Sequence, residues 1–591
     1  MTKSPVRLLS TLLALVGCAS ESASSPDSEN AVAVPGGKAD DLSHSPCTVG
    51  AVVDLLNDPD ITADSLRAGG LHTRAANNIV QTRLGPDGQR GTDDDVFFAD
   101  IVEVDDVPWV GPVALEQLTA MAPCEPPSGE GSADVIFSPQ PFERSHLARA
   151  VELIDGAEES LDVAMYSMSN SDVIEALGRA AARGISIRMI FHPAQSERRD
   201  PEGTRSGRLE AAGIDVRYIN KIMHHKFVLV DGPRGNPART SGWLMTGSGN
   251  WSNSAGNRYD ENALIIEGHA ELMLRYQREF DLLWDYSRDF EGQAFEQLHV
   301  DPIGQGVIDA NDDADVEAYF TSANFRTTES ARWGRGFSLV GDRGIDEVAD
   351  QLVRLIENAR SSIRIASGHL RSRPVAEALI AAVERNPDLD VRIYTDAKEF
   401  ISASSHARQV ENRQECLEEA TTDNQRQQCY DVGFLYGYEF FQAGIDIRFK
   451  YYSYRWHYSY AEQMHHKYFI VDEEIVMTGS YNLSDNAEHG TMENVVILRG
   501  PRFADIAQRY VDNFDAMWET GRFAGDGELT LYEELLDDVN TGTDEFAIVF
   551  ESMALNWDEV DVLKRAMRDA CPAINSEEMR RSPERFRTCR P

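Results

Sequence analysis

The most constraining feature of the chain is a stretch of nine residues that occurs twice. The first copy runs from Met223 to Asp231 and the second from Met464 to Asp472, and both read H-x-K-x4-D. Each copy is followed by a second matched signature, G-S-x-N, and then by a Glu-Asn pair. Because an internal repeat of this kind is typical of duplicated structural units, we expect two similar halves.

Side chains alternate along each copy. His224 and Lys226 point to one side of an extended segment, and the apolar run 227–230 indicates that this strand is buried in a sheet. His465 and Lys467 repeat the arrangement in the second copy. Each half therefore presents one imidazole and one ammonium group on the same side of a buried strand.

Together, the two copies supply residues suited to a phosphodiester. Histidine titrates near neutral pH, so one ring can attack phosphorus while the other protonates the leaving oxygen. Lysine and asparagine side chains can donate to the non-bridging oxygens as negative charge develops. The predicted phosphate-binding residues are Ser248, Asn250, Ser480 and Asn482.

Two pairs of acidic residues accompany the motifs. A carboxylate on the second nitrogen of each imidazole would fix its tautomer, and Glu261 and Glu493 are the candidates. Asp231 and Asp472 follow their histidines by seven residues, where we expect a structural, turn-bonding role. No metal or other cofactor is expected, because the site carries its own cations and no Cys/His cluster has ligand spacing.

Two full copies of H-x-K-x4-D, in order and with matched flanks, resemble the phospholipase D superfamily, whose members carry two such motifs around one active site. The resemblance covers about 133–522. It implies an α/β fold of two tandem α/β/α sandwich halves with the active site at their interface, and a covalent phosphohistidine intermediate. It assigns the catalytic roles to His224, Lys226, His465, Lys467, Glu261 and Glu493.

Strand and helix patterns alternate from Asp134 onward and place the two phospholipase D-like domains at 133–300 and 318–522. The second domain has two features that the first lacks. One is a polar insertion over 401–430. The other is an aromatic run over 451–460, which could stack bases, hold a choline headgroup, contact a lipid interface or simply form a core strand.

The N-terminal residues 1–18 are typical of a short secretory signal, since Lys3 and Arg7 precede an apolar run too short to span a membrane. The end of this segment resembles a bacterial lipoprotein box, which implies cleavage before Cys18 and lipid on its sulfur. Cleavage as an ordinary secretory signal is the alternative. A flexible tether is expected over 19–46.

A small all-α domain is predicted over 47–125. Its stretches 71–79 and 107–115 resemble helix-hairpin-helix elements, in which glycines let backbone amides approach a nucleic-acid phosphate. Trp109 replaces one of these glycines, so a packing or adaptor module is the alternative to nucleic-acid binding. At the other end, residues 523–591 read as a small helical appendage without an assigned function.

Charge and cysteine content limit the partners and the compartment. A net charge of -42 disfavours duplex DNA as an electrostatically steered partner. Of seven cysteines, six remain once Cys18 is set aside, and an even number favours disulfides in an oxidising compartment. The expected pairs, each bracketing one segment, are Cys47–Cys124, Cys416–Cys429 and Cys571–Cys589.

The sequence thus predicts phosphodiester hydrolysis. Phospholipase D action, which releases the headgroup and leaves phosphatidic acid, is the preferred reaction, because an exported, lipid-anchored protein at the outer membrane or cell surface lies next to phospholipid. An endonuclease is the alternative, since the first motif also resembles the small nucleases and cardiolipin hydrolases of the superfamily. A non-catalytic surface lipoprotein that binds DNA or a partner is a third reading. The two halves complete one site, so a monomer is expected.

Overall fold

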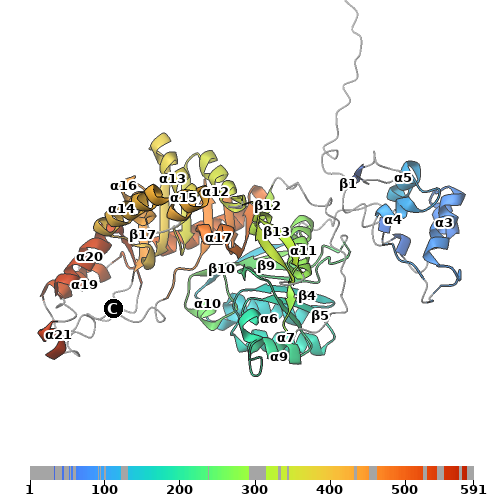
Figure 1. Ribbon diagram of the computed structural model, residues 1–591, viewed down its shortest axis with the longest axis horizontal. Helices are drawn as coiled ribbons and strands as arrows, with labels where there is room; N and C mark the ends of the chain where they lie inside the picture. Colours follow the sequence, from blue (N-terminus) through green and yellow to red (C-terminus); the bar gives the residue numbers. More distant parts are fainter. Residues whose placement is uncertain are drawn as a thin grey trace, which may run out of the picture. The chain divides into compact units, whose positions relative to one another are not determined.

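The duplicated sequence folds into two eight-stranded sheets in a computed structural model of the protein (Figure 1). The first sheet has the spatial order β11 (Arg288–Asp289), β6 (Asp215–Tyr218), β5 (Ser186–Phe191), β4 (Ser160–Met165), β8 (Lys226–Val230), β9 (Trp243–Gly247), β10 (Glu261–Glu267) and β3 (Ala133–Ser138). The second repeats it position by position with β22 (Met553–Asn556), β17 (Asp446–Tyr451), β16 (Asp390–Asp396), β15 (Ser362–Ser367), β18 (Lys467–Val471), β19 (Ile475–Gly479), β21 (Asn494–Leu498) and β12 (Val316–Phe320).

The chain divides into two units, residues 1–122 and 123–591. The structure describes residues 32–33, 43–44, 52–53, 55–57, 61–90, 92, 95–98, 101–121, 131–236, 239–291, 315–330, 334–341, 345–430, 435–451, 462–523, 529–541, 552–570 and 576–581. None of the helices in this part of the chain has both the length and the hydropathy that crossing a bilayer requires. The expectations for the signal segment and most of the aromatic run lie outside the described residues, as do those for Cys18, Cys47, Cys124, Cys571 and Cys589.

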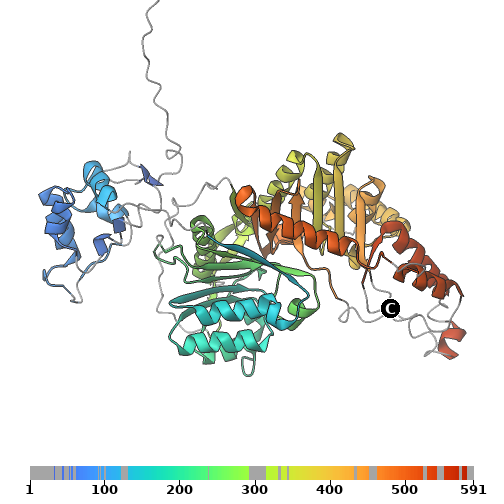
Figure 2. The same cartoon turned by 180° about the vertical axis from the view of Figure 1, so that it is seen from behind.

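Helices cover both faces of each sheet, which confirms the predicted α/β/α sandwich halves. One face of each sheet packs against a helix pair with its own apolar core, and the opposite face packs against one long helix. Figure 2 shows one of these long helices, orange-red, lying across the second sheet. The pairs are α6 (His146–Gly156) with α7 (Ser171–Ala182) and α12 (Glu347–Asn358) with α13 (Arg373–Arg385), and the long helices are α11 (Ala270–Asp285) and α18 (Ala504–Trp518).

The two halves share one hydrophobic core, which includes Phe227 and Tyr276 from the first half and Tyr468 from the second. Buried polar side chains also cross between the halves. Asn262 Nδ2 donates to Thr478 Oγ1 at 2.6 Å, and a matching bond of 2.9 Å runs from Thr246 Oγ1 to Asn494 Oδ1. Because unpaired polar groups in a core are costly, these bonds fix how one half faces the other.

In the second half one expectation is wrong and another is confirmed. The predicted helical appendage after residue 522 is wrong in one respect, because β22 pairs with β17 and completes the second sheet. The polar insertion forms two helices, α14 (Ala403–Glu419) and α15 (Asp423–Tyr430). The disulfide expected between Cys416 and Cys429 joins them, with Cα atoms 5.7 Å apart.

In the N-terminal unit the strands β1 (Val32–Ala33) and β2 (Ser43–His44) pair, and the elements described between residues 61 and 121 are helices. Of the two stretches that resemble hairpin elements, 107–115 contains a turn, whereas 71–79 lies mostly within a helix. Trp109 has φ of 73°, a conformation that favours glycine, and 60% of the residue is exposed. Its ring stacks on His72 at 6.2 Å, and the Arg74 guanidinium lies 4.3 Å from its centroid. The helices are α2 (Ala63–Ala68), α3 (Thr73–Arg83), α4 (Ile101–Asp106) and α5 (Pro112–Met121).

A buried ion cluster ties the first sheet to α11. Arg188 donates to both oxygens of Asp162 at 2.6 and 2.8 Å and to Asp281 at 2.8 Å, and all three side chains are 2% exposed. Arg234, from the loop after the first motif, donates to Asp162 at 2.7 Å. Because these side chains are buried, removal of one charge would leave its partners buried without a counter-charge.

We expect Arg188→Ala to lower the free energy of unfolding by about 3–5 kcal/mol, because two buried carboxylates would lose their shared cation. Chemical denaturation followed by tryptophan fluorescence measures this, since the Trp284 ring lies 5.4 Å from the guanidinium. The matched control is Arg179→Ala, which breaks a surface pair with Asp155 and should cost about 1 kcal/mol or less. Equal losses in the two variants would contradict the buried-cluster explanation.

Candidate active site

The two motif lysines open the central strands, and the histidines lie just before them. Lys226 begins β8 and Lys467 begins β18, so His224 and His465 project from the same edge of the two sheets. A short parallel pairing of Ile222–Met223 with Thr491–Met492 brings the first motif beside the second half. The packing of the two sheets therefore brings both motifs together where the two halves meet.

Each histidine is held by the glutamate of the opposite half. Nδ1 of His224 donates to the Glu493 carboxylate at 2.8 Å, and Nδ1 of His465 donates to Glu261 at 2.8 Å. Both glutamate side chains are at most 1% exposed. Because a carboxylate accepts the Nδ1 proton, Nε2 of each neutral ring keeps its lone pair. The sequence named these glutamates but could not pair them crosswise.

The lysines are buried behind the histidines. Lys226 Nζ donates to the His224 carbonyl at 2.7 Å, and Lys467 Nζ donates to the His465 carbonyl at 2.8 Å. Lys467 Nζ also lies 3.4 Å from His465 Nε2. Each ammonium group is thus fixed against the backbone of its own histidine, and that of Lys467 also lies beside the His465 ring.

Burial shifts every ionisable group of the site toward its neutral form. It lowers the pKa of Lys226 to about 7 and that of Lys467 to about 8. It raises the pKa of Glu261 and of Glu493 to about 7. Burial and the nearby lysines hold the histidine pKa values well below their usual range. An anion bound among these groups would favour the charged forms of the lysines and histidines.

We expect kcat/KM for phosphodiester hydrolysis to peak near pH 7. Below this pH Glu261 and Glu493 take up protons, because their pKa values are raised to about 7, and they no longer stabilise an imidazolium. Above it the lysines lose their charge, because the pKa of Lys226 is lowered to about 7 and that of Lys467 to about 8. A pH–rate profile measures both limbs. An alkaline limb near an ordinary lysine pKa of about 10.4 would contradict this explanation.

An open cavity of about 470 Å³ lies over the two histidines. Its lining is unequal, with few residues from the first half and most from the second. The lining residues that matter for the chemistry are Tyr166, Ile222, His224, His369, Arg371, His465 and Asn482.

Of the four predicted phosphate-binding residues, only Asn482 is among those lining this cavity. Ser248 and Ser480 are fully buried, and each accepts a hydrogen bond from a backbone N–H across the sheet, at 2.9 and 3.0 Å. Ser480 also donates to the Glu493 carboxylate at 2.6 Å. Asn250 is half-buried, and its backbone carbonyl accepts from His146. The serine hydroxyls therefore support the glutamate strands and do not face the cavity.

The motif aspartates have the structural position expected from the sequence. Asp231 follows β8 directly and accepts the backbone N–H groups of residues 158–160 at 2.7–3.0 Å. Asp472 accepts those of residues 360–362 at 2.7–3.1 Å. Both aspartates have positive φ, 52° and 53°, and so close a turn at the end of the strand away from the histidines.

The sequence did not single out several residues at the cavity. Tyr166 packs its ring 4.5 Å from that of His224, centroid to centroid. His369 and Arg371 follow β15 in the second half and line the same cavity. These residues lie outside the motifs. Their one signal in the sequence is that they come just after β4 and β15, the strands that flank β8 and β18.

Carboxylates that could hold a metal are also present away from the motifs. In the part of the chain that the structure describes, the one group of three acidic side chains at ligand spacing is Glu210, Asp215 and Asp289. None of them lines the cavity. A metal-free reaction therefore stays a prediction.

Comparison with known proteins adds the family. Residues 150–284 and 352–518, more than half of the chain, match the family described as cardiolipin synthase, PLD-like domain. The mitochondrial cardiolipin hydrolase of Danio rerio is 32% identical over 147 residues, which are 24% of this chain and 59% of that protein. The Mus musculus protein of the same name is 28% identical over 189 residues, 32% of this chain and 78% of that protein. The chain spans 57–59% of the length of the Chlamydomonas reinhardtii and Danio rerio relatives.

Solved structures give similar matches. A phospholipase D family member, Nuc from Salmonella typhimurium, is 26% identical, covers 27% of this chain and 97% of its own, and has a TM-score of 0.23. Phosphatidylserine synthase of Haemophilus influenzae is 12% identical, covers 64% of this chain and 86% of its own, and has a TM-score of 0.40. The family match covers most of both sheets and both H-x-K-x4-D motifs, and the chain therefore belongs to the phospholipase D superfamily.

Proposed function

We propose that this protein is a phospholipase D-type phosphodiesterase that hydrolyses phospholipid through a covalent phosphohistidine. The observation that carries the proposal is the pair of glutamate-held histidines, His224 and His465, that line one cavity. Lys226 and Lys467 lie beside them. This set supplies a nucleophile, an acid and two cations for the phosphate oxygens.

The surroundings of the two histidines divide the roles between them. The Tyr166 ring lies 4.5 Å from that of His224, whereas the equivalent backbone bond in the second half is made by Gly368, and the Tyr259 ring lies 6.5 Å from that of His465. The His224 side chain is 10% exposed and that of His465 is 23% exposed. The general acid must be accessible to the leaving alcohol and then to water. We therefore assign the more exposed His465 as acid and base and His224 as nucleophile.

In the first step His224 Nε2 attacks phosphorus in line, and the His465 imidazolium gives its proton to the departing headgroup oxygen. Lys226 and Lys467 neutralise the non-bridging oxygens. In the second step His465 takes a proton from water, and the resulting hydroxide attacks phosphorus from the side that the headgroup left. The P–N bond to His224 breaks, and phosphatidic acid is released.

A membrane phospholipid is the proposed substrate. The matched relatives are named cardiolipin hydrolases. Ile222, at the cavity rim, is 38% exposed, and with Tyr166 it gives the first-half wall an apolar character. Export with lipid on Cys18, proposed from the sequence of residues 1–18, would place the enzyme at a membrane as a monomer. Membrane fractionation of Cys18→Ala, which should become soluble, tests the anchor.

Release of phosphatidic acid from mixed phospholipid vesicles, in EDTA, tests the function. The chain lacking residues 1–18 should release it, and His465→Ala should not. No release by well-folded protein would refute the lipid substrate and turn attention to nucleic acid.

An endonuclease of the same superfamily is the second candidate. The observation that favours it is the N-terminal unit, where Trp109 keeps the backbone conformation of a hairpin glycine beside Arg74. The net charge of -42 opposes it. Cleavage of single-stranded DNA by the wild type, absent in His465→Ala, would favour this candidate over the phospholipase.

A further inference from the structure

The second half brings two basic side chains to the active-site cavity that the motifs do not account for. His369 and Arg371 follow β15, and both line the cavity that His224 and His465 share. Their side chains are 36% and 33% exposed, so a bound molecule can reach them. They extend the site beyond the groups needed for one phosphodiester.

A buried carboxylate holds both side chains from behind. Glu399, whose side chain is 1% exposed, accepts from Arg371 Nη2 at 2.7 Å and Nε at 3.3 Å, and from His369 Nδ1 at 3.5 Å. The arrangement repeats that of the motif histidines, each with a glutamate on Nδ1. Because the carboxylate is covered, a ligand in the cavity meets the guanidinium and the imidazole first.

Two acidic residues, Asp485 and Glu493, line the same cavity, and both are already paired with histidines. Asp485 accepts from His489 Nδ1 at 2.8 Å, and the other nitrogen of that ring lies 3.1 Å from Asp346. Burial would lower the pKa of His489, but these two hydrogen-bonded carboxylates raise it to about 10. His489 is therefore cationic and offsets the charge of Asp485.

The first half has no equivalent of Arg371. The Arg371 N–H donates to the Leu483 carbonyl, and at the matching place Ser169 and Asn170 donate to the Trp251 carbonyl. The cavity is therefore asymmetric, with Tyr166 and Ile222 on the His224 side and with His369 and Arg371 among the mostly polar residues of the second half. A phosphodiester with an apolar group on one ester oxygen and a charged group on the other would bind in a single orientation.

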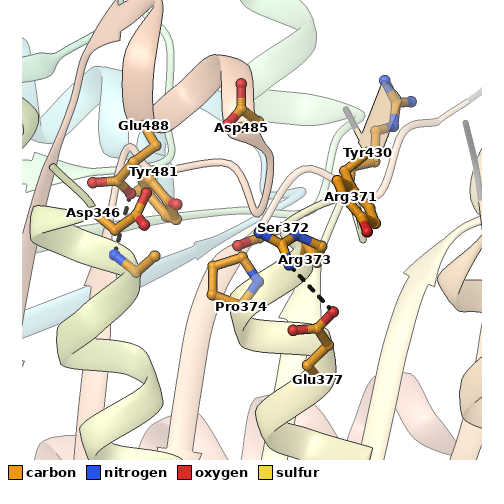
Figure 3. A pocket seen from close by; sticks show the side chains of 11 residues that line it. Asp346, Arg371, Ser372, Arg373, Pro374, Glu377, Tyr430, Tyr481, Asp485 and Glu488 are labelled. Carbon is orange, nitrogen blue, oxygen red and sulfur yellow. Dashed lines mark hydrogen bonds and ion pairs between the residues drawn. The ribbon is translucent and has the colours of Figure 1, made fainter. Parts of the chain in front are cut away.

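We propose that Arg371 and His369, held by Glu399, bind an anionic group on the alcohol that leaves phosphorus. A guanidinium fits two oxygens of a phosphate or carboxylate, and a bound anion would also favour the doubly protonated form of His369. A smaller pocket of about 70 Å³ shares Arg371 and Asp485 with the cavity (Figure 3). The inference rests on the proposed function and names its substrate class.

Dihexanoyl phospholipids, kept monomeric in solution, test the subsite without the charge of a membrane surface. Their leaving alcohols are choline, glycerol and glycerol phosphate, which are cationic, neutral and anionic. We expect kcat/KM to be highest for glycerol phosphate. Arg371→Gln should lower that value by about 10- to 100-fold and leave the choline substrate and bis(4-nitrophenyl) phosphate within about twofold.

The matched control is Arg392→Gln. Arg392 has a side chain of similar exposure, 32%, pairs with Asp390 at 3.0 Å, and lines neither the cavity nor the smaller pocket. Its replacement should leave all substrates unchanged. Arg371→Gln removes the cation that pairs with the buried Glu399 carboxylate, which can destabilise the fold. The double variant Arg371→Gln/Glu399→Gln removes both charges and repeats the test without that buried unpaired charge.

Two outcomes would overturn the subsite. One is a wild-type enzyme that does not prefer the glycerol phosphate substrate, and the other is an Arg371→Gln loss that is uniform across all substrates. Failure of the wild type to hydrolyse even bis(4-nitrophenyl) phosphate would instead refute the proposed function. The two failures are therefore distinguishable.

Discussion

Replacing His224 or His465 with alanine is expected to lower steady-state kcat/KM for phospholipid hydrolysis by at least about 10⁴-fold. Without His224 there is no nitrogen to form the P–N bond, and without His465 no acid protonates the leaving alkoxide. Both losses should appear although the two rings belong to different halves of the chain, since they line one cavity.

The two variants should differ on bis(4-nitrophenyl) phosphate, whose leaving group needs no proton. His465→Ala should release about one equivalent of nitrophenol and then stop, because the intermediate on His224 lacks a base to activate water. His224→Ala should show no burst. His406→Ala, which removes a histidine bonded to Glu439 at 3.0 Å, is the control and should retain full activity. Turnover retained in both active-site variants would contradict the catalytic roles assigned to the two histidines.

Glutamine at Glu493 is expected to slow formation of the covalent intermediate by about 100- to 1,000-fold. His224 would lose the carboxylate that orients its ring and stabilises the positive charge that the ring gains as the P–N bond forms. Glutamine at Glu261 should mainly slow breakdown of the intermediate, through His465. Rapid-quench measurement of the burst and of the steady state separates the two steps. Slow formation in Glu261→Gln and slow breakdown in Glu493→Gln would show that each glutamate serves its own half, against the crosswise pairing.

The sequence predicted the duplicated fold because the signals were local. The runs after Lys226 and Lys467 are apolar and short, so they could form only buried strands, and β8 and β18 begin at those residues. The crosswise pairing of histidines and glutamates was not predictable. It depends on how two sheets face each other, and that geometry is fixed by cross-half bonds such as Asn262 to Thr478.

Other differences have equally specific causes. The strand β22 was missed because it returns to the second sheet more than thirty residues after α18, whereas β11 follows α11 directly. Ser480 was expected at phosphate, but its hydroxyl satisfies the Glu493 carboxylate and a backbone N–H, which burial would otherwise leave unpaired. Arg371 and His369 occur in one half only, so a search for repeats could not find them.

The most direct test of the phosphohistidine route is intact-mass analysis of His465→Ala, quenched in alkali during reaction with bis(4-nitrophenyl) phosphate. A covalent route through His224 predicts an adduct of one 4-nitrophenyl phosphoryl group, located on the peptide that contains His224 and lost on brief acid treatment. Nitrophenol release without any adduct on the protein would contradict it, because water would then attack phosphorus directly.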